Sequence, residues 1–305
     1  MNPSFDPAHL AARSVASGQH YPQGALYLVP TPIGNLADFS LRGLYLLALV
    51  DAVACEDTRH TQQLWRALGA DTNRVRWLAL HQHNENQASA QVLEMLGQGL
   101  RVAYMSDAGT PGISDPGSRL VAAVHRAGRR VVPLPGPSSV TTLLSASGAW
   151  ATDGTEFVFI GFLPAKGAKR AQRLGQMLAD PRPQCVLEAP HRITALAQDL
   201  QAGGERGLTV GRELSKQFEE IASMRCDQLS AWLEASATRG KGEFALVLHE
   251  SLASSESPNA AGERELRLLL PHLPLRTAVQ LAAEISGCSR NALYAQALSW
   301  QKDSD

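Results

Sequence analysis

The sequence lacks long apolar runs, and this absence excludes two classes of protein. Nowhere do about 18 consecutive apolar residues occur, the length that a membrane-spanning helix needs. Residues 1–24 are polar and small, without the continuous apolar stretch of a secretory signal. We therefore expect a chain that neither spans a membrane nor is exported.

Closely spaced cysteines are also missing. Cys55, Cys185, Cys226 and Cys288 are scattered and form no C-x-x-C pair, so the sequence indicates neither a zinc motif nor a redox motif. The neighbouring histidines of the stretch LHQHNE have no third ligand at metal-binding spacing, and we interpret them as loop residues. We expect no metal site and a location in the reducing cytoplasm.

A strong charge of either sign is absent too. The formal net charge is -1, so any nucleic-acid partner must be held by local basic patches rather than by the field of the whole molecule. Hydrophobic residues make up 44% and charged residues 19%, which is ordinary globular usage. A folded chain of 305 residues is long enough for about two domains.

Short apolar runs alternate with amphipathic stretches from residue 25 onward, which predicts parallel strands joined by crossover helices. We expect a first α/β domain over residues 25–148, preceded by a disordered segment at 1–24. Its predicted strands are 25–29, 52–55, 77–80, 101–106 and 130–134. Its predicted helices are 41–50, 58–69, 86–96 and 117–127.

A second α/β domain is expected over residues 149–250. Its predicted strands follow one another with fewer helices between them, so we expect a mixed sheet. The strands are predicted at 157–162, 185–188, 208–212, 220–224 and 243–249, and the helices near 168–178 and 193–200.

The last part of the chain has a different composition. Residues 251–262 are rich in Ser, Ala, Pro and Asn and predict a flexible linker. A helical C-terminal domain at 263–305 follows, with helices predicted at 264–270, 276–285 and 290–298. The last two resemble a helix-turn-helix, and nucleic-acid contact and plain packing both remain open for them.

Three Gly/Pro-rich loops follow predicted strands of the first domain, at residues 30–36, 106–117 and 133–139. The first stands where a dinucleotide-binding protein carries G-x-G-x-x-G, and that fingerprint is absent. The carboxyl ends of parallel strands meet at one edge of a sheet, where open α/β folds bind ligands. The loops therefore predict a small-molecule site at that edge.

The motifs PTPIGNLADFS, CEDTRHTQQLW, SDAGTPGISDPG, PLPGPSS, GFLPAKG, EAPHR and RELSKQFEE occur in this order within residues 25–250. The set resembles the tetrapyrrole methylase superfamily and, within it, the ribosomal RNA small subunit methyltransferase I family. The resemblance implies a homodimeric enzyme that uses S-adenosylmethionine to methylate a cytidine ribose 2'-hydroxyl in 16S rRNA. It also implies that the cofactor binds in a cleft between the two α/β domains.

The resemblance further implies which residues contact the cofactor. They belong to the three loops, to the end of a strand near residue 162 and to the second domain: Pro32, Asp107, Ala108, Gly109, Thr110, Ile113, Ser114, Ser138, Ser139, Phe162, Leu163, Leu214 and Ala245. Where some relatives carry hydroxyl residues after Glu188, this chain has Ala189 and Pro190. A side-chain hydroxyl role at that point is therefore in doubt.

Charged residues just past strand ends are candidates for catalysis. They are Glu56 and Asp57 with Arg59, Glu188 with His191 and Arg192, and Glu213 with Lys216. Our hypothesis is that Glu188 or Glu213 accepts the proton of the ribose hydroxyl and that Lys216 or Arg59 stabilises the negative charge. The alternative is a set of salt bridges and helix caps.

A run of positive charge without an intervening acid follows the motif GFLP and consists of Lys166, Lys169, Arg170 and Arg173. It predicts contacts with RNA phosphates, although such a run can also be a solvated helix face. Two other functions stay open: methylation of a tetrapyrrole precursor, and a non-catalytic RNA-binding or ribosome-binding factor. The basic run argues against the first, and the ligand-binding loops argue against the second.

Overall fold

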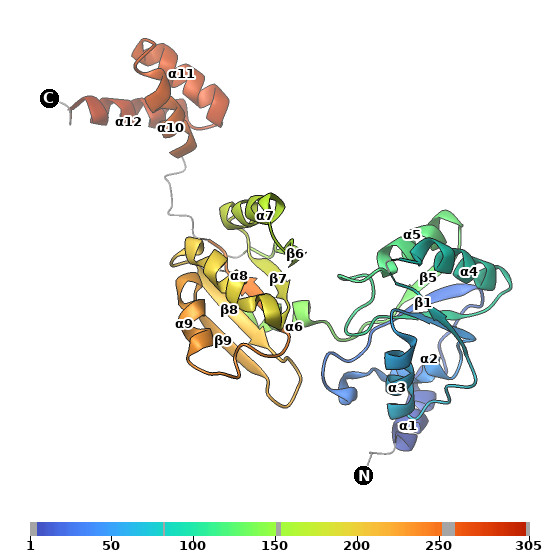
Figure 1. Ribbon diagram of the computed structural model, residues 1–305. Coiled ribbons are helices and arrows are strands. Elements are labelled where there is room, and N and C mark those ends of the chain that lie inside the picture. The colour runs from blue at the N-terminus through green and yellow to red at the C-terminus, as the bar shows by residue number, and fades with distance from the viewer. Residues whose placement is uncertain (1–4, 82, 151–153, 252–259, 303–305) are drawn as a thin grey trace. The chain divides into compact units, whose positions relative to one another are not determined.

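The computed structural model describes residues 5–81, 83–150, 154–251 and 260–302. Residues 1–250 belong to one compact unit and residues 251–305 to a second. The first unit holds two five-stranded sheets, and the described part of the second is helical (Figure 1). No helix in the described ranges is both long enough and apolar enough to cross a membrane.

The first sheet is entirely parallel, as the alternating pattern predicts, and has the strand order β3-β2-β4-β1-β5. Its strands are β1 (Ala25–Val29), β2 (Ala52–Cys55), β3 (Arg76–Ala79), β4 (Val102–Met105) and β5 (Arg130–Pro133). Because they are parallel, the loops that follow them leave from one edge of the sheet.

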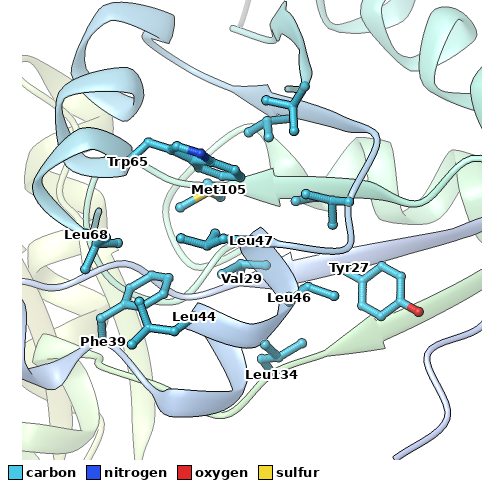
Figure 2. Packing of buried hydrophobic residues seen from close by; sticks show 14 of the residues in the cluster. Tyr27, Val29, Phe39, Leu44, Leu46, Leu47, Trp65, Leu68, Met105 and Leu134 are labelled. Atoms are coloured by element: carbon cyan, nitrogen blue, oxygen red, sulfur yellow. The ribbon is translucent and has the colours of Figure 1, made fainter. Parts of the chain in front are cut away.

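Helices cover both faces of the first sheet (Figure 1). Tyr27 and Val29 of β1 pack toward one face with Trp65 and Met105, as Figure 2 shows, whereas Leu26 packs on the other. This alternation is the period-two geometry of a strand. The first face is covered by α1 (Asp6–Ala16), α2 (Leu41–Leu47) and α3 (Thr58–Ala67), and the second by α4 (Glu85–Gly97) and α5 (Gly117–Arg126).

The prediction of disorder at residues 1–24 is wrong for the part that the structure describes. Helix α1 packs against α2 and buries Ala12 and Ala16, which lie four residues apart on one helix face. His9 Nε2 lies 2.7 Å from the carbonyl oxygen of Leu68 and ties the helix to the end of α3. The buried residues of the helix itself are alanines, which a search for long apolar runs does not detect.

The second sheet is mixed, as predicted, with the order β6-β7-β10-β8-β9. Only the β6–β7 pair is parallel. The strands are β6 (Val158–Phe162), β7 (Gln184–Glu188), β8 (Gly207–Arg212), β9 (Glu220–Arg225) and β10 (Phe244–Leu248). One face is covered by α7 (Ala168–Ala179), α8 (Ile193–Leu200) and α9 (Leu229–Glu234).

The other face of the second sheet is covered by α6 (Ser139–Ser147). Val140, Leu143 and Leu144 of this helix pack with Ala245 and Val247 of β10. The boundary that we predicted at residue 148 assigns this helix to the first domain, whereas its apolar contacts are with the second sheet. Helix α6 therefore couples the end of the third Gly/Pro loop to the second sheet.

The second unit has its own apolar core of residues such as Leu266, Val279 and Leu293. It is formed by α10 (Ala260–Leu269), α11 (Leu275–Ser286) and α12 (Arg290–Lys302). Gly287 ends α11 in a left-handed conformation, φ 71°, at the turn of the predicted helix-turn-helix. Of the predicted linker, residues 252–259 lie outside the described residues, and α10 begins at Ala260.

Candidate functional site

The three Gly/Pro-rich loops meet at the carboxyl edge of the first sheet. Thr31 and Gly109 form an isolated antiparallel bridge in which each main-chain N–H donates to the other's carbonyl at 3.0 Å. The hydroxyl of Thr110 donates to the carbonyl of Pro137 at 2.9 Å, which joins the second loop to the third. Gly109 has φ +79°, a conformation that favours glycine.

A cavity of about 400 Å³ opens at this point. Its size lies within the range of small-molecule sites, roughly 300 to 1,000 Å³. The wall is drawn from both sheets of the first unit: Ile33, Glu56, Ser106, Asp107, Ala108, Gly109, Thr110, Ile113, Ser114, Asp115, Ser138, Ser139, Val140, Phe162, Leu187, Glu188, Ala189, Pro190, Leu214, Glu243, Phe244 and Ala245.

All but two of the predicted cofactor contacts line this cavity. Pro32 does not; it lines a neighbouring hollow together with Gly34 and His60. Leu163 is 2% exposed and belongs to the buried core on one face of the second sheet, together with Met177 and Val186. For these two residues the predicted side-chain contact with a ligand is not supported by the geometry.

Backbone strain is concentrated in two segments beside the cavity. Among the described non-glycine residues, only Ser114, Glu213 and Ser215 have positive φ, at 67°, 52° and 63°. Ser114 lines the cavity, and Glu213 and Ser215 flank Leu214, which also lines it. A left-handed conformation costs about 1–2 kcal/mol for a residue with a Cβ, and such costs cluster at functional sites.

Glu56 was one of our catalytic candidates, although the hypothesis gave it no specific role. It follows β2 directly and lines the cavity with Asp107 and Asp115. Burial, together with the negative charges of Asp107 and Asp115, raises the pKa of Glu56 to about 7. In the sequence, only its position just past a predicted strand marks Glu56 as a candidate. The acidic residues that raise its pKa come from a segment about fifty residues away, so the sequence does not show that they are neighbours.

Asp115 holds the second loop in shape. Its carboxylate accepts hydrogen bonds from the main-chain N–H groups of Gly112 and Gly117, both at 2.7 Å, and from the hydroxyl of Tyr104 at 3.0 Å. No side chain fits at Gly117, because a Cβ there would collide with the Tyr104 ring. The loop is therefore preorganised, and it holds the carboxylate of Asp115 near Glu56.

Glu188 lines the cavity but lies in a buried ion-pair network. Its side chain is fully buried, with Arg192 Nε at 3.0 Å and Arg170 Nη1 at 3.9 Å. The main-chain N–H of Ala189 also donates to it at 3.0 Å. Two guanidinium groups thus balance its charge, and the salt-bridge alternative describes Glu188 better than the role of a free base.

Arg170 is the member of the predicted basic run whose RNA contact is contradicted by its surroundings. Its side chain is only 11% exposed, its guanidinium lies 2.7 Å from Asp199, and it donates to the carbonyl of Pro164 at 3.0 Å. Lys166 and Lys169 are exposed, and Arg173 is half-buried. The charge open to solvent at the start of α7 comes chiefly from the two lysines.

Glu213 and Lys216 form a second ion-pair cluster beside the cavity; neither lines its wall, whereas Glu243, which also pairs with Lys216, does. Lys216 Nζ lies 2.9 Å from Glu213 Oε1 and 3.1 Å from Glu243 Oε2. Burial opposes ionisation of Glu213, but the Lys216 ammonium and the Glu243 amide outweigh it and lower the pKa of Glu213. The stem of Lys216 fills the space that a side chain at Gly34 would need. These residues brace the first loop against the second sheet.

Arg59 and Asp57 also lie outside the cavity wall. Asp57 caps α3, since its carboxylate accepts from the main-chain N–H of Arg59 at 2.8 Å. The Arg59 side chain is exposed. The helix-cap alternative therefore describes this pair, and the predicted charge-stabilising role of Arg59 has no support in the geometry. Among the described residues, no group of three or more side chains could hold a metal ion.

Comparison with protein families gives two matches. Residues 25–230 match the model of the tetrapyrrole (corrin/porphyrin) methylases. Residues 256–301 match the model described as the RsmI C-terminal HTH domain. The two matches together span both units of the chain.

Curated relatives cover nearly the whole chain and are named ribosomal RNA small subunit methyltransferase I. The protein from Escherichia coli O157:H7 is 44% identical over 92% of this chain and 96% of its own. The one from Vibrio cholerae is 44% identical over 90% and 94%, and the one from Pseudomonas aeruginosa is 43% identical over 91% and 98%.

Solved structures with the same fold are more distant. A cobalt precorrin-4 methyltransferase aligns with a TM-score of 0.54 at 17% identity, over 75% of this chain and 98% of its own. A uroporphyrin-III C-methyl transferase from Thermus thermophilus, solved with S-adenyl homocysteine, aligns with a TM-score of 0.51 at 16% identity, over 73% and 96%. At these identities the likeness concerns the fold.

Proposed function

Since the chain belongs to the tetrapyrrole methylases, we propose that it methylates 16S rRNA of the small ribosomal subunit, with S-adenosylmethionine as the methyl donor and a cytidine ribose 2'-hydroxyl as the acceptor. The observation that carries this proposal is one cavity of about 400 Å³ lined by all three Gly/Pro-rich loops. The relatives named for this rRNA activity match both units of the chain.

The cavity has the chemistry that the methyl donor needs. S-adenosylmethionine carries a positive sulfonium, an ammonium, ribose hydroxyls and a flat adenine ring. No lysine or arginine lines the cavity, whereas the carboxylates of Glu56, Asp107 and Asp115 do. Apolar side chains suited to the ring form other parts of the wall, among them Ile113, Val140, Phe162, Leu214 and Ala245.

When bound, S-adenosylmethionine supplies a methyl group attached to a positive sulfur, and the transfer is an in-line displacement. The main contribution of the chain is to hold two reactants in line, which the preorganised loop around Asp115 permits. A bond forms between the ribose oxygen and the methyl carbon, the carbon–sulfur bond breaks, and the hydroxyl proton must go to a base. Glu56 is the group that we assign to this role.

Glu56 suits the role better than Glu188 or Glu213. Its carboxylate has a pKa near 7, which matches the range in which general bases work well. Glu188 is paired with Arg192 and Arg170, and Glu213 with Lys216. Those two carboxylates stabilise the structure around the site. Lys216 is already paired with Glu213 and Glu243, so its charge is compensated.

The remaining parts of the proposal concern partners and location. Lys166, Lys169 and Arg173 contact phosphates of the rRNA beside the cavity, and the C-terminal helices add a second point of contact. The enzyme acts in the cytoplasm as a homodimer, as the family resemblance implies. Sedimentation of the purified protein at micromolar concentration tests the homodimer, and a single species of about 33 kDa would contradict it.

Two measurements test the function itself. Calorimetric titration with S-adenosylmethionine should give one site for each chain, and a chain that does not bind it would be a non-catalytic factor. Methyl transfer from labelled S-adenosylmethionine should then be measured with 30S subunits, free 16S rRNA and a tetrapyrrole precursor. We expect incorporation into rRNA, and transfer to the tetrapyrrole alone would favour the alternative acceptor.

A further inference from the structure

Helix α5 and the turn after it carry a row of exposed arginines that the site does not use. Arg119 stands in the first turn of the helix and Arg126 at its end, and Arg129 and Arg130 follow the left-handed Gly128. All four side chains are exposed, and so is His125. We call Arg119, Arg126, Arg129 and Arg130 the arginine track.

Most of the charge of this track is uncompensated. Arg119 is paired with Glu85 at 3.2 Å, yet its side chain remains 76% exposed. Arg126, Arg129 and Arg130 take part in no ion pair within the described ranges of the chain. Other arginines, such as Arg170, Arg192 and Arg239, are paired with acids. In a protein of net charge -1, such a row is a local basic surface.

Stabilisation of the helix end explains only part of the track. A cation in the last turn of a helix interacts favourably with its dipole, and Arg126 is in that place. Arg129 also reaches the end of α4, since a Cβ on Gly97 would lie 3.6 Å from its guanidinium. Arg130 opens β5, beyond both helices. Stabilisation of the two helix ends therefore accounts for Arg126 and Arg129 but not for Arg130.

The track starts next to the cavity and leads away from it. Asp115 lines the cavity, and α5 begins two residues later at Gly117. Arg119 and Arg126 lie seven residues apart, which places them on the same helix face, and both line the groove between α4 and α5. A helix of 10 residues is about 15 Å long. This length equals roughly four nucleotides of a stacked strand at 3.4 Å each.

We propose that the arginine track binds the sugar–phosphate backbone of the RNA substrate, a few nucleotides from the residue that enters the cavity. The inference rests on the proposed function and adds a docking surface to it. Arginine suits this role because its guanidinium binds phosphate oxygens with two parallel hydrogen bonds. The track belongs to the first half of the unit, whereas Lys166 and Lys169 belong to the second, so the substrate is held on two sides.

The test compares two triple variants that remove the same charge. In the track variant, Arg126→Gln, Arg129→Gln and Arg130→Gln leave the paired Arg119 in place. In the control variant, Arg13→Gln, Arg66→Gln and Arg76→Gln remove three exposed arginines from α1, α3 and β3. Binding to 16S rRNA fragments and to 30S subunits is measured over a series of salt concentrations, together with methyl transfer and calorimetric titration with S-adenosylmethionine.

The track variant should lose about two to three units from the slope of log K against log salt, because each phosphate contact contributes a little under one unit. Its affinity for S-adenosylmethionine should match that of the wild type, and its melting temperature should fall by at most about 4 °C, because Arg126 interacts with the dipole of α5. The control variant should match the wild type in its salt slope, its methyl transfer and its affinity for S-adenosylmethionine. The proposal would be overturned if the track variant and the control variant had equal slopes of log K against log salt. A loss seen with 30S subunits but not with rRNA fragments would also overturn it, since that result indicates a ribosomal protein as the partner.

These outcomes are separable from failure of the function. If the wild-type protein methylates rRNA and the track variant binds it with an unchanged slope, only the arginine track is refuted. If the wild-type protein neither binds nor methylates rRNA, the proposed function itself is refuted.

Discussion

Ser114 and Gly161 meet at the cavity from opposite halves of the first unit. A Cβ placed on Gly161 would lie 3.4 Å from Ser114 Oγ, and both residues have left-handed backbone, with φ of +69° and +67°. Their neighbours Ile113 and Phe162 are 45% and 51% exposed and line the cavity. This close approach of the two backbones places two apolar side chains in the cavity wall.

Glu56→Gln should abolish most of the methyl transfer. The amide is close in size to the carboxyl but cannot accept the proton, and a general base contributes about a hundredfold or more to the rate. The single-turnover rate of the wild type should rise with pH and level off above a midpoint near pH 7, the pKa of Glu56. The variant should lose this rise, and its affinity for S-adenosylmethionine should fall far less than the rate, because Asp107 and Asp115 still supply negative charge to the cavity. A variant with the wild-type rate would remove Glu56 from the mechanism.

The same substitution should alter how stability depends on pH. Folding raises the pKa of Glu56 from 4.5 to about 7, so the folded state binds more protons than the unfolded state between these values. Stability due to this group is therefore present at low pH and lost as pH rises through that window. Urea denaturation should show Glu56→Gln gaining stability relative to the wild type from pH 5 to pH 8. A constant difference would mean that the pKa is not raised.

Gly109→Ala should weaken ligand binding more than folding. Its φ of +79° costs an L-residue about 1–2 kcal/mol, and the new Cβ would lie 3.4 Å from the Ile33 side chain at the bridge with Thr31. Gly128→Ala is the matched control, because Gly128 has φ +64° and no atom within 4 Å of a Cβ. Both variants should melt at similarly reduced temperatures, but only Gly109→Ala should lose affinity for S-adenosylmethionine in calorimetry. Equal affinities would show that the loop does not shape the site.

Glu188→Gln should destabilise the protein by about 3–5 kcal/mol, because it leaves Arg192 without its buried counter-charge and Arg170 with Asp199 alone. Glu205→Gln serves as the control. It breaks the pair with Arg225, whose acidic member is 87% exposed, and should cost at most about 1 kcal/mol. Denaturant unfolding measures both. If Glu188→Gln kept wild-type stability and lost only activity, the catalytic role of Glu188 in our first hypothesis would return.

Much of the architecture could be predicted from local pattern. The strands at 25–29 and 52–55 and the helix at 193–200 have the bounds that their periodicity predicts, and the mixed character of the second sheet follows from the spacing of its strands. Three helices are missing from the prediction. The buried residues of α1 are small alanines, α9 (Leu229–Glu234) is only six residues long, and the apolar residues of α6 have only a weak helical period.

The three loops of the cavity wall could be predicted because parallel strands end at one edge, so that loops far apart in sequence must meet there. The wall residues of the second sheet, such as Phe162 and Leu214, were implied by the family resemblance alone. The roles of the charged residues could not be predicted, because they depend on which opposite charge each group meets. Glu188 ends β7, and Glu213 and Glu56 directly follow β8 and β2. The first two meet Arg192 and Lys216, whereas Glu56 meets Asp107 and Asp115.

By itself, the sequence determined the two sheets, their order along the chain and the loops that form the site. Only the tertiary structure decided which acid stays unpaired in the cavity, which arginines are buried and which are free to bind a phosphate. The physical reason is range: strand and helix periods are set by near neighbours, whereas the free energy of a charge depends on burial and on groups brought close from distant segments.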